Sequence, residues 1–159
     1  MLFRSVDEVR ALRTPSASPP PAPDPGSLRD LDAALVDLGC TYTLCHDGAA
    51  RRLSFGETPG RDAFVLELSK ADGRYLFARA TPVGDPPLPH GRRTIEALHA
   101  LNAGIAMGTV FIGASRTDAS YFIALPLAFT PVNLDVVRYL VGRSGATIER
   151  MRAELPRSR

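Results

Sequence analysis

An alternation of apolar and polar side chains is the feature that most constrains this fold. Residues 63–69 and 74–80 both alternate, and Asp72-Gly73 lies between them. Residues 41–46 alternate in the same way before Asp47-Gly48, and the pattern resumes after that pair. A period of two is typical of half-buried strands, and Asp-Gly is typical of hairpin turns. The pattern predicts an antiparallel meander of three or four strands.

Three other segments carry apolar residues at helical spacing. The first follows Ser27, a good N-cap, and stops at Gly39. The second covers residues 92–107. The third opens with Thr130-Pro131, as N-cap and first helical residue, and runs to about Leu155. Each pattern predicts an amphipathic helix that packs through one face.

Two further strands are predicted between the second and third helices, at residues 109–114 and 120–129. Pro126 cannot donate to a ladder, so we expect the second of these strands to lie at an edge or to be bulged. The proline-dense residues 81–89 are predicted as a loop. The order is therefore helix, three or four strands, helix, two strands, helix, which indicates the α+β class with an antiparallel sheet.

The chain divides into four parts. Ser5 to Glu8 has the form of a capping box, so residues 1–13 are expected to hold a short helix. Residues 14–26 are rich in proline and are interpreted as a semi-rigid linker rather than a recognition motif. Residues 27–155 form the domain, and residues 156–159 form a tail.

The length and charge of the chain set limits on its class. A chain of 159 residues suits one domain, and its formal net charge is only +2. Nothing global therefore demands a nucleic acid or an anionic membrane as partner. We find no signal peptide and no apolar run long enough to cross a bilayer, so we expect a cytoplasmic protein. Lys70 is the only lysine among 19 basic residues.

The residues that could carry chemistry do not form a recognisable set. Cys40, Cys45 and His46 are near one another in sequence, and such side chains can bind zinc. Neighbours on a strand point to opposite faces, however, so we expect Cys45 and His46 to point apart and to bind no metal. His99 lies at the border of the apolar stripe of its helix, where a lone histidine is more often a structural or exposed side chain than a catalytic base. There is no Ser-His-Asp arrangement, phosphate loop or dinucleotide fingerprint, so we expect neither an enzyme nor a cofactor.

Two polar features have competing interpretations. Asn102 lies beside the apolar stripe of its helix, and we expect its amide to tie the helix end to a neighbouring strand or loop rather than to bind a ligand. Arginines also gather at the C-terminus, where they could contact phosphates or simply form a solvated face, and we favour the latter. These arginines are Arg138, Arg143, Arg150, Arg152, Arg157 and Arg159.

Residues 27–155 resemble the YbjN family, whose fold is also that of the small type III secretion chaperones. The resemblance rests on three local features in order: the opening from Leu35 to Gly39 with Tyr42 and a turn at Asp47-Gly48, the helix ending in Leu101-Asn102, and Phe129-Thr130-Pro131 before an apolar helix. It implies a dimer that holds a partially unfolded client, and bacterial relatives associated with regulation and stress. The family pattern contains no catalytic residues.

The last helix is apolar on two sides, and residues 109–114 are apolar on both faces, which is more than one small core needs. We therefore expect a non-catalytic chaperone-like or adaptor protein that binds a protein client as a homodimer. The alternatives are an accessory nucleic-acid protein that uses the C-terminal arginines, with direct binding weak or absent, and a small-molecule-sensing regulator. The candidate interface residues are Ile95, Leu98, Leu101, Ile105, Phe111, Val132, Val136 and Tyr139.

Overall fold

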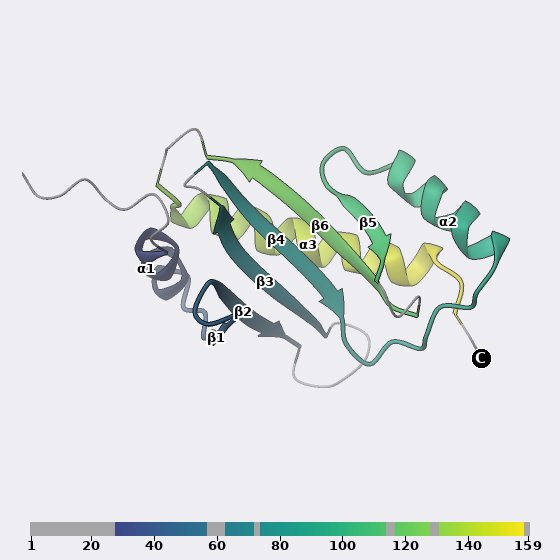
Figure 1. The fold of residues 1–159 in the computed structure, drawn as a ribbon, viewed down its shortest axis with the longest axis horizontal. Coiled ribbons are helices and arrows are strands. Elements are labelled where there is room, and N and C mark those ends of the chain that lie inside the picture. Colours follow the sequence, from purple (N-terminus) through teal and green to yellow (C-terminus); the bar gives the residue numbers. More distant parts are fainter. Residues whose placement is uncertain (1–27, 57–62, 72–73, 114–116, 128–130, 158–159) are drawn as a thin grey trace, which may run out of the picture.

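The computed structural model describes residues 28–56, 63–71, 74–113, 117–127 and 131–157. They form three helices and six strands in the predicted α+β order (Figure 1). In chain order the elements are α1 (Arg29–Asp37), β1 (Thr43–Cys45), β2 (Ala50–Phe55), β3 (Phe64–Ala71), β4 (Tyr75–Pro82), α2 (Arg92–Ala103), β5 (Thr109–Ile112), β6 (Ala119–Pro126) and α3 (Leu134–Glu154).

The strands make one antiparallel sheet, as predicted, and their order in it is β1-β2-β3-β4-β6-β5. The expectation that Pro126 marks an edge or a bulge is wrong, because β6 lies between β4 and β5 with a regular register. Pro126 is the last residue of β6 and faces Tyr75, the first residue of β4. The end of a strand tolerates a missing donor better than its middle.

All three helices lie on one side of the sheet. α3 packs on β3, β4 and β6, and both α1 and α2 contact α3. In Figure 1 the yellow α3 runs behind the strands, α1 lies beside it near β1 and β2, and α2 lies beside β5. The other side of the sheet, which we call the open face, is covered by no helix of the described residues.

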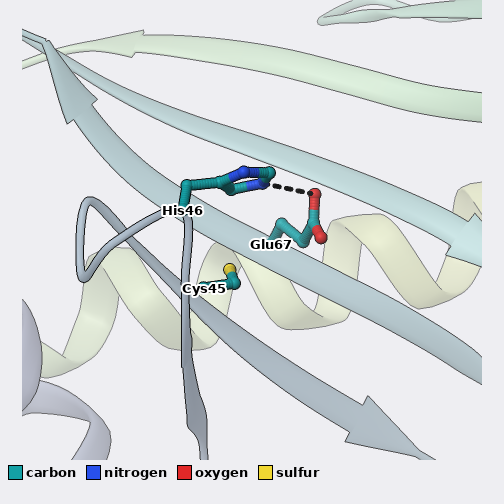
Figure 2. A group of neighbouring side chains, drawn as sticks. All are labelled: Cys45, His46 and Glu67. Carbon is teal, nitrogen blue, oxygen red and sulfur yellow. Dashed lines mark ion pairs between the residues drawn. The ribbon is translucent and has the colours of Figure 1, made fainter.

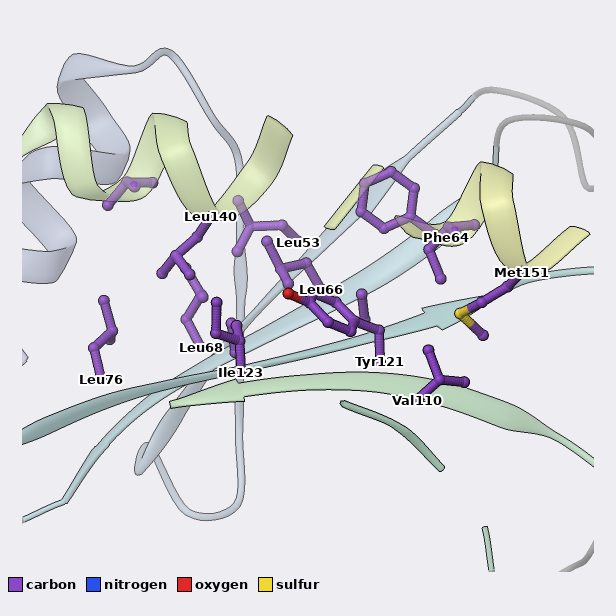
Figure 3. Close-up of a cluster of buried hydrophobic side chains, with 14 of the residues drawn as sticks. Leu53, Phe64, Leu66, Leu68, Leu76, Val110, Tyr121, Ile123, Leu140 and Met151 are labelled. Carbon is purple, nitrogen blue, oxygen red and sulfur yellow. The ribbon is translucent and has the colours of Figure 1, made fainter. Parts of the chain in front are cut away.

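The core fills the space between α3 and the covered face of the sheet. Leu66 and Leu68 of β3 and Ile123 of β6 are fully buried there. Leu140 and Met151 of α3 belong to the same buried cluster, with Met151 near Val110 (Figure 3). Gly145 of α3 faces the sheet, and a Cβ at that position would lie at an ordinary contact distance of 3.7 Å from the ring of Phe64. Burial of this apolar surface is the main stabilising contribution to the fold.

Several predicted boundaries are wrong. α3 begins at Leu134 rather than at Pro131, because Asn133 is the N-cap and its side chain accepts a hydrogen bond from the Val136 amide at 3.0 Å. α2 ends at Ala103 rather than at Met107, and Gly104 is its C-cap. β4 extends through Pro82 into the predicted loop, β6 ends at Pro126, and the N-cap of α1 is Leu28. The predicted N-terminal helix, the proline-rich linker and the last two residues of the tail lie outside the described residues.

Gly108, just before β5, sits where no side chain fits. Its φ is +87°, and a Cβ there would lie 2.5 Å from the ring of buried Tyr121 and 2.6 Å from the carbonyl oxygen of Phe122. The Tyr121 hydroxyl donates a hydrogen bond to the Met107 carbonyl at 2.6 Å, which fixes the ring against this turn. The backbone here therefore requires glycine.

Asp30 joins three elements. One of its carboxylate oxygens accepts a hydrogen bond from the Val132 amide at 2.6 Å. Both carboxylate oxygens of Asp30 lie within 3.2 Å of the ammonium group of Lys70. The side chain of Lys70 is only 7% exposed. The single lysine of the chain is thus an internal ion-pair partner that ties β3 to α1 and to the segment leading into α3.

Asn102 closes the edge of the sheet at β5. Its side-chain amide donates to the Val110 carbonyl at 2.8 Å, and its side-chain oxygen accepts from the Val110 amide at 2.7 Å. The expectation that this residue ties the helix end to a neighbouring strand is confirmed. The pair of bonds satisfies two backbone groups that an edge strand otherwise leaves open.

Among the described helices, none combines the length and the hydropathy that a membrane span requires.

Candidate functional site on the open face of the sheet

A row of aromatic rings crosses the open face. Tyr75 and Phe77 of β4 stack with parallel planes at a centroid distance of 6.1 Å, and Phe77 meets Phe122 of β6 at 5.6 Å. Phe77 and Phe122 are half-buried, although no described helix covers them, and Tyr75 is 45% exposed. Phe111 of β5 continues the row at the edge of the sheet. We call Tyr75, Phe77, Phe122 and Phe111 the aromatic row.

Arg79 is the charged member of this surface. Its guanidinium group lies 5.6 Å from the centroid of the Phe111 ring, within the range of a cation–π contact. Arg79 is exposed, and no carboxylate of the described residues lies within ion-pair distance of it. The open face therefore presents a positive charge beside apolar rings.

A shallow hollow of about 410 Å³ adjoins the aromatic row. Its lining includes the small side chains of Ala50 in β2 and Ser69 in β3, and the rings of Phe77 and Phe122. The complete lining is His46, Ala49, Ala50, Glu67, Ser69, Lys70, Phe77, Arg79 and Phe122. The hollow shares Phe77 and Phe122 with the aromatic row and so extends its contact surface.

His46 and Glu67 of this lining converge with Cys45 (Figure 2). One potential ligand atom from each side chain lies within 4.8 Å of the other two. The expectation that Cys45 and His46 point apart is wrong. His46 belongs to the turn rather than the strand, and its φ of +51° turns its side chain back toward Glu67.

Glu67 is oriented by Arg52, its cross-strand neighbour. Two nitrogens of Arg52 donate to the same oxygen, Oε1, at 2.6 and 3.0 Å. The other oxygen, Oε2, lies 4.0 Å from Nε2 of His46. The hydrogen bond to Glu67 raises the pKa of the Arg52 guanidinium above its ordinary value.

The eight predicted interface residues fall in different places. Leu101 and Val132 are buried in the core, so they are not available to a partner. Leu98, Ile105 and Val136 are half-buried around α2 and α3, and Phe111 belongs to the aromatic row. Ile95 and Tyr139 are 54% and 45% exposed.

Three C-terminal arginines bond within the chain. Arg152 pairs with Asp85 at 2.9 Å and donates to the Ala63 carbonyl, and Arg157 pairs with the same carboxylate at 2.8 Å. Arg150 pairs with Glu154 and donates to the carbonyl of Gly104. These contacts hold the end of α3 and the chain segments beside it, which leaves less charge for phosphates.

Of the aromatic row, only Phe111 was among the predicted interface residues. The signal was present, because Tyr75 and Phe77 share one face of their strand while Leu76 and Ala78 share the other. A strand that is apolar on both faces is buried on both or carries an uncovered apolar face. The sequence does not show that all the helices pack on the same side.

Comparisons with known proteins support the fold. The sequence matches no known protein family, and no curated protein shows significant similarity. The structure is similar to the crystal structure of YbjN from E. coli, a proposed transcription regulator, with a TM-score of 0.59 and 18% sequence identity. The similarity covers 81% of this chain and 93% of YbjN, and confirms at the level of the fold the resemblance seen in the sequence: the chain has a YbjN-like fold.

Proposed function

We propose that this protein is a non-catalytic adaptor that binds a segment of a client protein on the open face of its sheet. The aromatic row carries the proposal, because a monomeric domain rarely leaves a contiguous set of rings uncovered. Aromatic side chains and arginine are also the residues enriched where protein interfaces gain most of their free energy. Phe77 and Phe122 sit at the centre of this surface.

The chemistry of the open face specifies the client segment. Glu67 is neutralised by Arg52, whereas Arg79 has no described ion-pair partner. A complementary partner therefore carries apolar side chains that cover Phe77 and Phe122, with an acidic residue placed to reach Arg79. Such a pairing is favourable because the acidic residue would complement the charge of Arg79 and accept a charge-assisted hydrogen bond from it.

A single-stranded nucleic acid is the second candidate for this surface. Its bases could stack on Phe77 and Phe122, as bases do on other open antiparallel sheets. Nucleic-acid affinity, however, depends on several cations along the strand path. On the open face, Arg79 supplies one such cation, whereas Arg52 is neutralised by Glu67. The C-terminal Arg150, Arg152 and Arg157 form ion pairs within the chain. We therefore favour a protein client.

Site-specific photo-crosslinking in the native cell tests the occupant. We expect a photo-reactive phenylalanine analogue at position 77 or 122 to trap a defined protein partner. The same probe at Ala146 is the matched control, because this exposed residue lies on α3, away from the open face. A second change, Arg79→Glu, is expected to reduce the crosslink at least tenfold by reversing the charge.

The nature of the trapped product decides between the candidates. A nuclease-sensitive adduct at positions 77 and 122 would establish the nucleic acid instead. Equal crosslinking from Ala146, or an unchanged yield with Arg79→Glu in protein of unaltered circular dichroism, would contradict a client on the open face.

The proposal includes a homodimer formed through α2. The outer side of this helix carries Arg92, Ile95, Glu96 and His99 at helical spacing, and Ile95 is exposed although apolar. Arg92 and Glu96 form an ion pair within the helix at 2.6 Å, so an antiparallel copy related by a two-fold axis would meet no net charge repulsion around the two Ile95 side chains. These features support a second copy as the partner of this surface.

We expect light scattering at micromolar concentration to give twice the chain mass of 17.1 kDa. Ile95→Glu should shift the protein to the monomer mass, because it places two carboxylates at the centre of the interface. Val36→Glu serves as the control, since Val36 is an equally apolar exposed residue on α1. A wild-type protein of 17.1 kDa would refute the dimer without touching the client surface.

A further inference from the structure

We propose that Cys45, His46 and Glu67 form a binding site for a zinc-type divalent ion. The three side chains offer a sulfur, a nitrogen and an oxygen, the donor atoms that Zn²⁺ binds in proteins. Three protein ligands with a fourth position left to water is the arrangement found in open zinc sites. This site goes beyond the proposed adaptor function and does not depend on it.

The backbone brings the ligands together by an uncommon route. Cys45 is the last residue of β1 and His46 is the next in sequence, so an extended chain would separate them across the sheet. His46 and Asp47 instead have φ values of +51° and +54°, in the left-handed region. That conformation costs roughly 1 kcal/mol per non-glycine residue, and here it turns the imidazole toward Glu67.

The distances suit an ion after a small adjustment. Zn–S and Zn–N bonds of about 2.3 and 2.0 Å place tetrahedral ligand atoms about 3.5 Å apart. The three ligand atoms lie within 4.8 Å of one another before any ion is bound. The His46 side chain is 67% exposed, so it can rotate inward without displacing the core. The small Ala50, which pairs with Cys45, leaves room beside the thiol.

Arg52 prepares the carboxylate. Both of its hydrogen bonds go to Oε1 of Glu67, which leaves Oε2, the oxygen nearest His46, available to a metal. Outer hydrogen bonds of this kind hold metal ligands in orientation and increase affinity.

The two cysteines of the chain provide a matched test. Equilibrium dialysis with Zn²⁺ on the full chain should give one ion per chain, and Co²⁺ should give the near-ultraviolet band of a thiolate–metal bond. Cys45→Ser should abolish that band, and both Cys45→Ser and His46→Gln should weaken Zn²⁺ binding about a hundredfold, since even an outer partner of a ligand contributes ten- to hundredfold. Cys40→Ser and His99→Gln should bind like the wild type.

Three results would overturn the site. They are the absence of stoichiometric Zn²⁺ from the wild type, a cobalt–thiolate band that persists in Cys45→Ser, and equal weakening by Cys40→Ser. Circular dichroism on the same samples separates loss of binding from loss of folding. Because the readout is the ion itself, neither a missing client nor a monomeric state affects the outcome.

Discussion

Gly108→Ala is expected to lower the free energy of unfolding by about 4 kcal/mol, the sum of backbone strain and overpacking. The φ of +87° is one that an alanine rarely adopts, and its methyl group would lie 2.5 Å from the Tyr121 ring. The ring cannot retreat, because it is buried and its hydroxyl bonds to the Met107 carbonyl. The Phe122 carbonyl cannot move away either, because it belongs to β6, a strand inside the sheet.

Gly142→Ala is the matched control, measured by urea unfolding followed with circular dichroism. A Cβ at Gly142 meets nothing within 4 Å, and the residue lies inside α3, where alanine is favoured over glycine. This variant should therefore gain roughly 0.5–1 kcal/mol. If both changes shifted stability in the same direction and by similar amounts, the close contact at Gly108 would be refuted.

Lys70→Met is expected to cost about 3 kcal/mol, because it leaves the carboxylate of Asp30 partly buried without its cation. The methionine retains most of the apolar volume, so the loss reports the ion pair rather than a cavity. Adding Asp30→Asn to the same protein should recover part of the stability, since the uncompensated charge is then absent. A double variant less stable by the full sum of the two single changes would contradict the coupling.

The ion pair between Asp30 and Lys70 also makes the free energy of unfolding depend on pH in the acid range. Burial alone would raise the pKa of the Asp30 carboxyl, but the hydrogen bonds from Val132, Lys70 and Leu31 outweigh it and lower the pKa below its ordinary 3.8. A lowered pKa stabilises the folded state above the ordinary value, and the contribution is lost as the pH falls below about 3.8. Comparing unfolding at about pH 7 and about pH 3 should therefore show a smaller difference for Asp30→Asn than for the wild type.

Local patterns predicted the fold well because they are set by local chemistry. The alternation in β3 and β4 and the stop at Gly39 follow from burial of one face and from backbone freedom, and both are visible in the sequence. The limits of α3 were less predictable. Thr130-Pro131 and Asn133 both have the chemistry of a helix start, and Asn133 is the N-cap in the folded chain.

The candidate site could not be predicted from the sequence, because it depends on contacts between distant segments. Whether Phe77 is buried or open depends on which side α3 packs. Whether His46 faces Cys45 depends on a turn that departs from the two-residue Asp-Gly form. Arg51 is a further case: a strand arginine that is buried because Asp32 of α1 accepts two of its hydrogen bonds, at 2.6 and 2.9 Å.

The two hydrogen bonds between the Asn102 side chain and the Val110 backbone limit the addition of further strands to the sheet. A strand from another molecule would need the same two backbone groups that the Asn102 amide already engages. At the opposite edge, β1 is only three residues long, so it has few backbone groups with which an added strand could pair. The six-stranded sheet is thus finite at both ends, which protects a protein with the apolar edge sequence Thr109–Ile112 from polymerising strand by strand into fibres.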